Sequence, residues 1–413
     1  MSSTSLSRPR TIDAPELLAP AGDMERLKMA AAYGADAVYL AGRRFGMRAS
    51  AVNFPDDALR EAVRYAHARG VKVYVTCNTL PREEELKELP GYLAFLQDAE
   101  ADALIIADLG VLELAKRYAP KLSRHVSTQF GVVNSATAKA LYDLGADTVV
   151  LARETPLADI RRIRENTPEA LRLEAFVHGA MCVSFSGRCL LSNYLTGRDA
   201  NRGQCAQPCR WKYQLVEETR PGQYFEISED GGTHIMNSRD MCMIGHIPEL
   251  LDAGLSSFKI EGRMKSAYYT AVITNAYRHA IDAALAGEAP DPVWLRETEM
   301  VSHRPYTTGF YFGEPGQYYP DSMYDAGADV TAVVESCESD GFAVLTQRNK
   351  FSVGDELELL TPGDKPVLFR AEALFDEEGE PIADTRRAMM RFSMRLPCAA
   401  PALSLVRKRR ESA

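Results

Sequence analysis

The chain has 413 residues, of which 46% are hydrophobic and 25% are charged, and these fractions are close to the averages of folded globular proteins. Long disordered tracts, collagen and coiled coils are therefore disfavoured, and the length suits two or three domains or one large barrel with an appendage. The net charge of −9 excludes a generally basic surface for nucleic acid, although it leaves room for local basic patches.

The first residues do not resemble a targeting signal. Arg8 and Arg10 precede a short, broken apolar stretch, which is not the pattern of a signal peptide. No apolar run approaches the roughly 20 residues that a membrane-spanning helix needs. We therefore expect a cytoplasmic protein that makes no use of a membrane.

Short β-rich runs alternate with amphipathic stretches over the first 265 residues. Apolar runs of this length are typical of strands buried on both faces of a parallel sheet. They predict eight strands, at residues 16–21, 37–41, 71–77, 103–107, 125–129, 148–152, 173–177 and 257–260. Apolar residues at spacings of three and four predict helices between them, at residues 23–33, 57–68, 83–99, 111–119, 135–144 and 157–165.

This alternation predicts an α/β fold, a (β/α)8 TIM-like barrel over residues 13–300. A doubly wound open sheet is the alternative, but it predicts a Gly-rich phosphate turn after the first strand, where only Pro20-Ala21-Gly22 occurs. The alternation breaks after the seventh strand. Residues 179–256 are therefore expected to form a long Cys-rich excursion on the face where barrel active sites lie.

The pattern changes again after a predicted helix at residues 267–285. Residues 301–326, rich in Gly, Pro, Tyr and Phe, are predicted to be a linker. Residues 327–406 contain short β runs without helices, which predicts a small all-β domain. We expect residues 407–413, which begin Arg-Lys-Arg-Arg, to be a solvated basic tail.

Five of the eight cysteines fall within 61 consecutive positions: Cys182, Cys189, Cys205, Cys209 and Cys242. In a chain without a signal peptide, such crowding favours a metal site or catalysis over disulfides. Only Cys205 and Cys209 have the short spacing of a structural zinc site, so the set favours an iron–sulfur cluster. Five buried, inert cysteines are the simpler interpretation.

Residues 174–192, EAFVHGAMCVSFSGRCLLS, resemble the signature of the collagenase-like peptidase family U32. The resemblance extends over most of the chain through GQCAQPCRW, NSRDMC, FKIEGRMKSAYY and YTTGFY. Better-understood branches of this family are RNA and quinone hydroxylation factors with an oxygen-sensitive 4Fe-4S cluster. This chain is most similar to the branch that forms 5-hydroxyuridine at the tRNA wobble position, a reaction that depends on prephenate or a related chorismate-pathway metabolite.

The resemblance also implies which cysteines bind the cluster. The spacing of the family places the ligands at Cys182, Cys189, Cys205 and Cys242. One cysteine is left over, and Cys209 could replace Cys205 because the two are only four residues apart.

Polar side chains follow the predicted strands, at the end of the barrel that carries active sites. We expect His178 and Glu261 to transfer protons and Arg153 to take part in catalysis. Arg153 and Arg263 could hold the carboxylate of a small metabolite. The remaining predicted substrate contacts at strand ends are Asn78 and Gln129. Each of these residues could instead be a polar cap or a member of an ion pair at the rim.

Residues 188–212 hold five basic residues against one acidic residue, with Tyr194 and Trp211 between them. Basic and aromatic side chains near an active face suit phosphate contact and base stacking. We therefore expect Arg188, Arg210 and Trp211 to contact an RNA substrate, with tRNA as the partner.

Three functions remain compatible with these patterns. The first is an iron–sulfur RNA hydroxylase acting on a uridine that has left the base stack, with a protein partner for electron supply. The second is a peptidase, for which the chain lacks the G-x-S-x-G and H-E-x-x-H motifs but offers a cysteine nucleophile beside His178. The third is an accessory hydroxylation factor for another substrate, ribosomal RNA or a quinone precursor.

Overall fold

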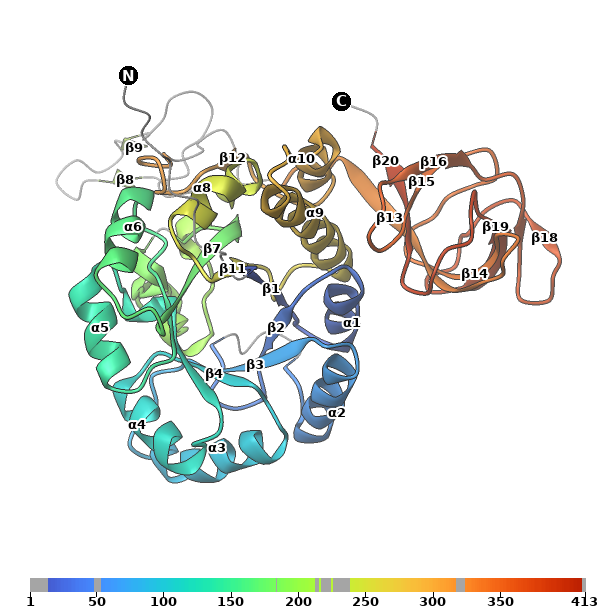
Figure 1. The fold of residues 1–413 in the computed structure, drawn as a ribbon. Helices are drawn as coiled ribbons and strands as arrows, with labels where there is room; N and C mark the ends of the chain where they lie inside the picture. The colour runs from blue at the N-terminus through green and yellow to red at the C-terminus, as the bar shows by residue number, and fades with distance from the viewer. Residues whose placement is uncertain are drawn as a thin grey trace, which may run out of the picture.

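The computed structural model describes residues 14–47, 53–182, 184–211, 215–216, 224–225, 238–316 and 324–410. A ring of helices surrounds a closed parallel barrel, and an antiparallel β domain lies beside helices α9 and α10 of this ring (Figure 1). The TIM-like barrel and the small all-β domain predicted from the sequence are thus confirmed.

Eight parallel strands close the barrel, because the last of them pairs with both the first and the seventh. Nearly all of their side chains are buried, which accounts for the apolar runs in the sequence. In barrel order the strands are β1 (Glu16–Pro20), β2 (Ala37–Leu40), β3 (Lys72–Cys77), β4 (Ala103–Ile106), β5 (Ser123–Val126), β6 (Thr148–Val150), β7 (Arg172–Ala180) and β11 (Ser257–Ile260).

The outer helices follow the predicted order. They are α1 (Met24–Ala32), α2 (Asp56–His67), α3 (Leu89–Asp98), α4 (Leu109–Tyr118), α5 (Ser135–Asp143), α6 (Leu157–Glu165), α8 (Ile247–Asp252), α9 (Ala267–Leu285) and α10 (Pro292–Glu299). The helix predicted at residues 83–99 is shorter, because a 3₁₀ turn, η1 (Glu85–Lys87), precedes α3 and Pro90 lies in the first turn of the helix.

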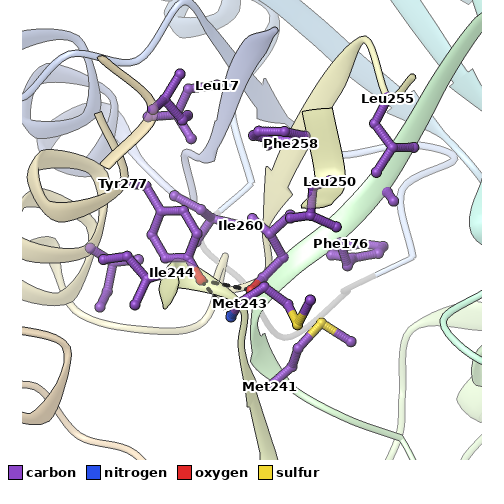
Figure 2. Packing of buried hydrophobic residues seen from close by; sticks show 14 of the residues in the cluster. Leu17, Phe176, Met241, Met243, Ile244, Leu250, Leu255, Phe258, Ile260 and Tyr277 are labelled. Carbon is purple, nitrogen blue, oxygen red and sulfur yellow. Dashed lines mark hydrogen bonds between the residues drawn. The ribbon is translucent and has the colours of Figure 1, made fainter. Parts of the chain in front are cut away.

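Apolar side chains on the outer face of the strands pack against the helices. Figure 2 shows this packing around Phe258 and Ile260 of β11 and Tyr277 of α9. The Tyr277 hydroxyl donates to the carbonyl of Val177 at 2.7 Å and accepts the N–H of Met243 at 3.0 Å. Helix α9 is therefore attached to both sides of the excursion that follows β7.

Where the structure describes the excursion, it includes the short helix α7 (Leu191–Thr196), a two-stranded pair, β8 (Leu215–Val216) with β9 (Tyr224–Phe225), and a return strand, β10 (Asp240–Cys242), before helix α8. Strand β10 runs antiparallel to β7 and pairs on its other side with β12 (Tyr306–Thr307). The segment predicted to be a linker thus contributes a strand to the barrel sheet, and Val301 and Tyr311 are buried in its core.

The C-terminal domain is a single antiparallel sheet of eight strands in the order β16-β15-β20-β13-β14-β19-β17-β18. Its strands are β13 (Ala328–Cys337), β14 (Phe342–Gln347), β15 (Glu356–Leu360), β16 (Val367–Arg370), β17 (Leu374–Phe375), β18 (Pro381–Ile382), β19 (Arg391–Arg395) and β20 (Leu405–Arg409).

The predicted basic tail is wrong for its first residues. Strand β20 includes Arg407, which is fully buried and bonded to Glu297 of α10 and Glu358 of β15 at 2.6 and 2.8 Å. The two carboxylates stabilise the buried guanidinium. The positive charge of Arg407 was therefore a poor guide to its exposure. Among the described helices, none is long and apolar enough to cross a bilayer.

Candidate active site

A cavity of about 460 Å³ lies at the carboxyl ends of the barrel strands. Its floor and walls come from the strand ends, and its roof comes from the excursion after β7. Of the predicted site residues, nine line it: Asn78, Gln129, Arg153, Cys182, Cys189, Cys205, Arg210, Glu261 and Arg263. The topology therefore brings together residues up to 185 positions apart, from Asn78 to Arg263.

The floor holds a buried ion pair. The ammonium of Lys259 lies 2.7 Å from Oε1 of Glu174, whose Oε2 accepts the hydroxyl of Ser257 at 3.0 Å. The rings of Tyr39 and Phe176 flank the same ammonium, with centroids 4.8 and 5.5 Å away. The carboxylate and the rings stabilise this charge, and the cavity lies on its remaining side.

A second ion pair forms one wall. Arg153 Nη2 lies 2.7 Å from Glu261 Oε2, and Nη1 donates to the carbonyl of Ala180 at 3.3 Å. The guanidinium stacks 4.0 Å from the centre of the Phe176 ring. The side chains are only 12% and 20% exposed, so Arg153 and Glu261 form a pre-organised polar edge of the cavity.

A further part of the lining combines two amides with one guanidinium. The Asn78 amide donates to Gln129 at 3.0 Å, and its oxygen accepts the N–H of Met47 at 3.0 Å. Arg263 is 5% exposed, and its guanidinium donates to Thr76 and to the carbonyl of Met47 at 3.4 and 3.3 Å. Amides and a guanidinium at these positions can orient a planar polar ligand.

Two glycines allow the loops to approach the barrel closely. A Cβ on Gly22 would lie 2.2 Å from the carbonyl of Arg263. Gly179 has a φ of +109°, and a Cβ there would lie 2.5 Å from the carbonyl of Glu261. The backbone at Glu261 and Arg263 can therefore keep its position only if residues 22 and 179 are glycines.

Four thiols form the roof. Cys182, Cys189, Cys205 and Cys209 all line the cavity. The sulfur of Cys209 lies close enough to the other three for their charges to contribute, after burial, to raising its pKa. These are four soft ligands on a surface that faces a cavity.

Two of these sulfurs accept hydrogen bonds from the backbone. The N–H of Leu191 lies 3.3 Å from Cys189 Sγ, and the N–H of Gln207 lies 3.3 Å from Cys205 Sγ. Such bonds stabilise a thiolate and tune an iron–sulfur centre. Among the described residues, no three His, Cys, Asp or Glu side chains are arranged to chelate a single ion. Four thiols without a histidine among them form a soft donor set, whose chemistry suits an iron–sulfur cluster.

The roof is attached to the barrel at two points. Glu154, after β6, accepts the backbone N–H and the hydroxyl of Ser186 at 2.6 and 2.8 Å. Arg202 forms a two-pronged pair with Glu85 in the loop after β3, at 2.5 and 2.9 Å. The excursion therefore extends across the mouth of the barrel and covers the cavity.

Cys242 lies elsewhere. Its sulfur lies 3.9 Å from the hydroxyl of Thr298 and 4.0 Å from that of Tyr277, and burial raises the pKa of its thiol. It does not line the cavity. The structure thus brings together Cys182, Cys189 and Cys205 of the expected ligand set, with Cys209 and not Cys242 beside them.

His178 also lies outside the cavity, which corrects its expected position. Lys259 pairs with Phe176, and the next residue, Ile260, pairs with His178, so β7 carries one extra residue, Val177. This bulge turns His178 to the outer face with Ile260. Its Nδ1 lies 3.3 Å from the hydroxyl of Tyr277, and burial lowers its pKa to about 3. A neutral, enclosed imidazole cannot pair with a cavity cysteine, so the arrangement predicted for a peptidase does not form there.

The predicted RNA contacts divide into two groups. Arg210 lines the cavity, whereas Arg188 and Trp211 are exposed and do not. Trp211 and Tyr194 are 42% and 83% exposed. They remain candidates for contacts with a large ligand outside the cavity.

The sequence analysis missed two lysines that line the cavity, Lys259 and Lys265. Lys259 could have been found from the alternating direction of side chains along β11. Phe258 and Ile260 face the helices, so the residue between them must face the barrel interior. Lys265 lies in a loop, where no periodicity indicates direction.

The family comparison agrees with the signature residues. The model of peptidase family U32 matches residues 22–319, and that of the peptidase family U32 C-terminal domain matches residues 327–407. The chain is 37% identical to tRNA hydroxylation protein P1 of Bacillus subtilis, with 92% of each chain covered. It is 37% identical to tRNA hydroxylation protein P of Escherichia coli, over 89% of this chain and 91% of the relative.

A third relative acts on another RNA. The chain is 35% identical to the 23S rRNA 5-hydroxycytidine C2501 synthase of Escherichia coli, over 88% of this chain but only 55% of that protein. The two family models and the two relatives of 37% identity thus point to one family. The chain belongs to peptidase family U32.

Proposed function

We propose that this protein is an RNA-modifying enzyme that hydroxylates the wobble uridine of tRNA to 5-hydroxyuridine. One observation carries the proposal: four thiols and several cations meet in a single cavity at the catalytic end of a barrel. Two relatives that match this chain over nearly their whole length are named tRNA hydroxylation proteins. The relative that modifies cytidine in ribosomal RNA is matched over only about half its length.

The cofactor in this proposal is a 4Fe-4S cluster. Cys182, Cys189 and Cys205 would bind three of its irons, and their position in the roof supports Cys209 as the fourth ligand. When bound, such a cluster supplies one-electron transfer at the cavity. The cysteine spacing of the family favours Cys242 instead. Experiment must therefore decide between Cys209 and Cys242 as the fourth ligand.

The remaining residues would bind and orient the substrates. A uridine must leave the base stack to enter the cavity. There the amides of Asn78 and Gln129 can hydrogen-bond a base edge, and Glu261 can hold a proton, with Arg153 stabilising its carboxylate. Arg263 and Lys259 are placed to hold the carboxylate of a small metabolite such as prephenate. A separate protein would supply electrons.

The first test is cofactor content. The protein purified without oxygen is expected to be brown, with about four irons and four sulfides per chain. Cys182→Ala, Cys189→Ala, Cys205→Ala and Cys209→Ala should each lose most of the iron, while Cys242→Ala keeps it. Cys398→Ala, at an exposed cysteine of the C-terminal domain, is the matched control. Iron retained in Cys209→Ala but lost in Cys242→Ala would assign the fourth ligand to Cys242, and stoichiometric zinc would refute the cluster.

The second test is the modified nucleoside. Mass spectrometry of tRNA from a strain lacking this gene, complemented with each variant, measures 5-hydroxyuridine. Wild type and Cys398→Ala should restore the nucleoside, and the iron-free variants should not. An unchanged nucleoside pool in the deletion strain, in the absence of a redundant enzyme, would refute the substrate.

A further inference from the structure

Three cations meet around one tyrosine at the edge of the cavity. Nη1 of Arg210 and Nη2 of Arg304 both donate to the hydroxyl of Tyr324, at 2.9 and 3.0 Å. The ammonium of Lys265 lies 4.1 Å from the centre of the same ring and donates to the carbonyl of Ser302 at 2.8 Å. We call Arg210, Lys265, Arg304 and Tyr324 the Tyr324 cluster. All but Arg304 line the cavity.

The charges of this cluster are not balanced within the part of the chain that the structure describes. Asp240 lies 3.8 Å from the Arg304 guanidinium and accepts the backbone N–H of the same residue, so it offsets one charge. The ion pairs of the described residues give no carboxylate to Arg210 or Lys265. Arg304 is 1% exposed, yet its Nε has no hydrogen-bond partner among the described residues.

Burial and the neighbouring cations both disfavour the charged form of Lys265. Burial, together with the charges of Arg304 and Arg210 and against the opposing effect of Asp240, lowers the pKa of Lys265 to about 8. A bound anion would relieve this repulsion. The Tyr324 hydroxyl already accepts two N–H groups, so its own proton is left to donate to an anion.

We propose that the Tyr324 cluster binds a backbone phosphate of the RNA whose base enters the cavity. This inference rests on the proposed function, and it says where the phosphate of the RNA substrate would bind. Guanidinium and ammonium groups are the usual partners of phosphate oxygens. Because the cluster lies at the edge of the cavity and not on its floor, a nucleotide bound there would extend its base inward. A metabolite carboxylate has the same donor requirements, so the test separates the two anions.

The test uses the anaerobically purified full chain and a labelled tRNA anticodon stem-loop. Fluorescence anisotropy gives the dissociation constant at several salt concentrations for wild type, Lys265→Met, Arg210→Gln and the rescue variant Lys265→Arg. Each lost phosphate contact should weaken binding and reduce the slope of log affinity against log salt by about 1. Lys265→Arg should restore both. Lys116→Met, in α4 and far from the cavity in sequence and fold, should match wild type.

Each other outcome overturns the inference in a distinct way. Wild-type affinity and slope in both Lys265→Met and Arg210→Gln would refute the phosphate site and leave the proposed function standing. If malonate binds the wild type but not these variants while RNA binding is unchanged, the cluster is a carboxylate site. Absence of salt-dependent RNA binding by the wild type would contradict the proposed function as well.

Discussion

At the scale of single residues, the floor of the cavity depends on one ion pair. The Lys259 and Glu174 side chains are 4% and 0% exposed, so each charge has lost its water. Their attraction compensates that loss only while both are present. The same pair places an ammonium in the lining of the cavity.

Lys259→Met is therefore expected to lower the free energy of unfolding by about 3–5 kcal/mol, because the Glu174 carboxylate stays buried without its partner. Urea denaturation followed by circular dichroism measures the change. The double variant Glu174→Gln, Lys259→Met should lose less free energy of unfolding than the two single variants lose together.

Lys72→Met is the matched control for this prediction. Lys72 pairs with Glu16 at 3.1 Å, but its side chain is 54% exposed and Glu16 keeps its bond to Tyr74. Lys72→Met is expected to lower the free energy of unfolding by about 1 kcal/mol or less. Equal losses in Lys72→Met and Lys259→Met would contradict the role given to burial.

At the scale of elements, the roof is an excursion attached to the barrel by a few side chains. The Arg202–Glu85 pair attaches the part of the roof that holds Cys205, while Glu154 attaches the part between Cys182 and Cys189. The positions of the thiols therefore depend on contacts outside the cysteine segment.

The Arg202 contact gives this attachment a pH dependence. Hydrogen bonds from Arg202 hold the pKa of Glu85 at about 2, below its ordinary value of 4.5. A carboxyl with a lowered pKa in the folded state stabilises that state fully above the ordinary value. This contribution is lost as the pH falls from about 4.5 towards 2.

Glu85→Gln should therefore lower the melting temperature at pH 6, and its difference from wild type should shrink between pH 5 and pH 3. Thermal unfolding across this range measures the difference. Glu83→Gln, in the same exposed loop, is the control and should follow wild type at every pH. A constant difference for Glu85→Gln would show that the ion pair does not supply the stability.

At the scale of the whole molecule, buried polar contacts join the barrel to the β domain. Arg407 of β20 binds Glu297 of α10, and its Nη1 also lies 3.3 Å from the hydroxyl of Tyr268 in α9. Tyr33 of the barrel donates to the carbonyl of Leu360 at 3.0 Å. The β domain thus stabilises the side of the barrel that carries α9 and α10 (Figure 1).

Arg407→Met should lower the free energy of unfolding by about 3–5 kcal/mol, because Glu297 and Glu358 lose the cation between them. Calorimetry should then resolve separate transitions for the two domains. Arg410→Met, which removes an exposed pair with Asp329, should change stability by about 1 kcal/mol or less. A single unshifted transition in Arg407→Met would refute the coupling.

The sequence by itself determined the features that are local or periodic. Apolar runs at regular intervals predicted the eight barrel strands, because burial on both faces of a strand excludes polar residues. Short β runs without helices between them predicted the all-β domain. The spacing of the cysteines and the signature around Glu174 predicted the family and the face that carries the site.

Only the tertiary structure decided which of these residues meet. One extra residue in β7, Val177, turned His178 away from the cavity, since a shift of one position reverses the direction of a side chain in a strand. Cys209 lies with the cavity thiols and Cys242 does not, because the path of the excursion sets their distances. The Tyr324 cluster joins residues from four separate segments, and Arg407 is buried by carboxylates far from it in sequence. Contacts between such distant residues follow from packing, which no local pattern records.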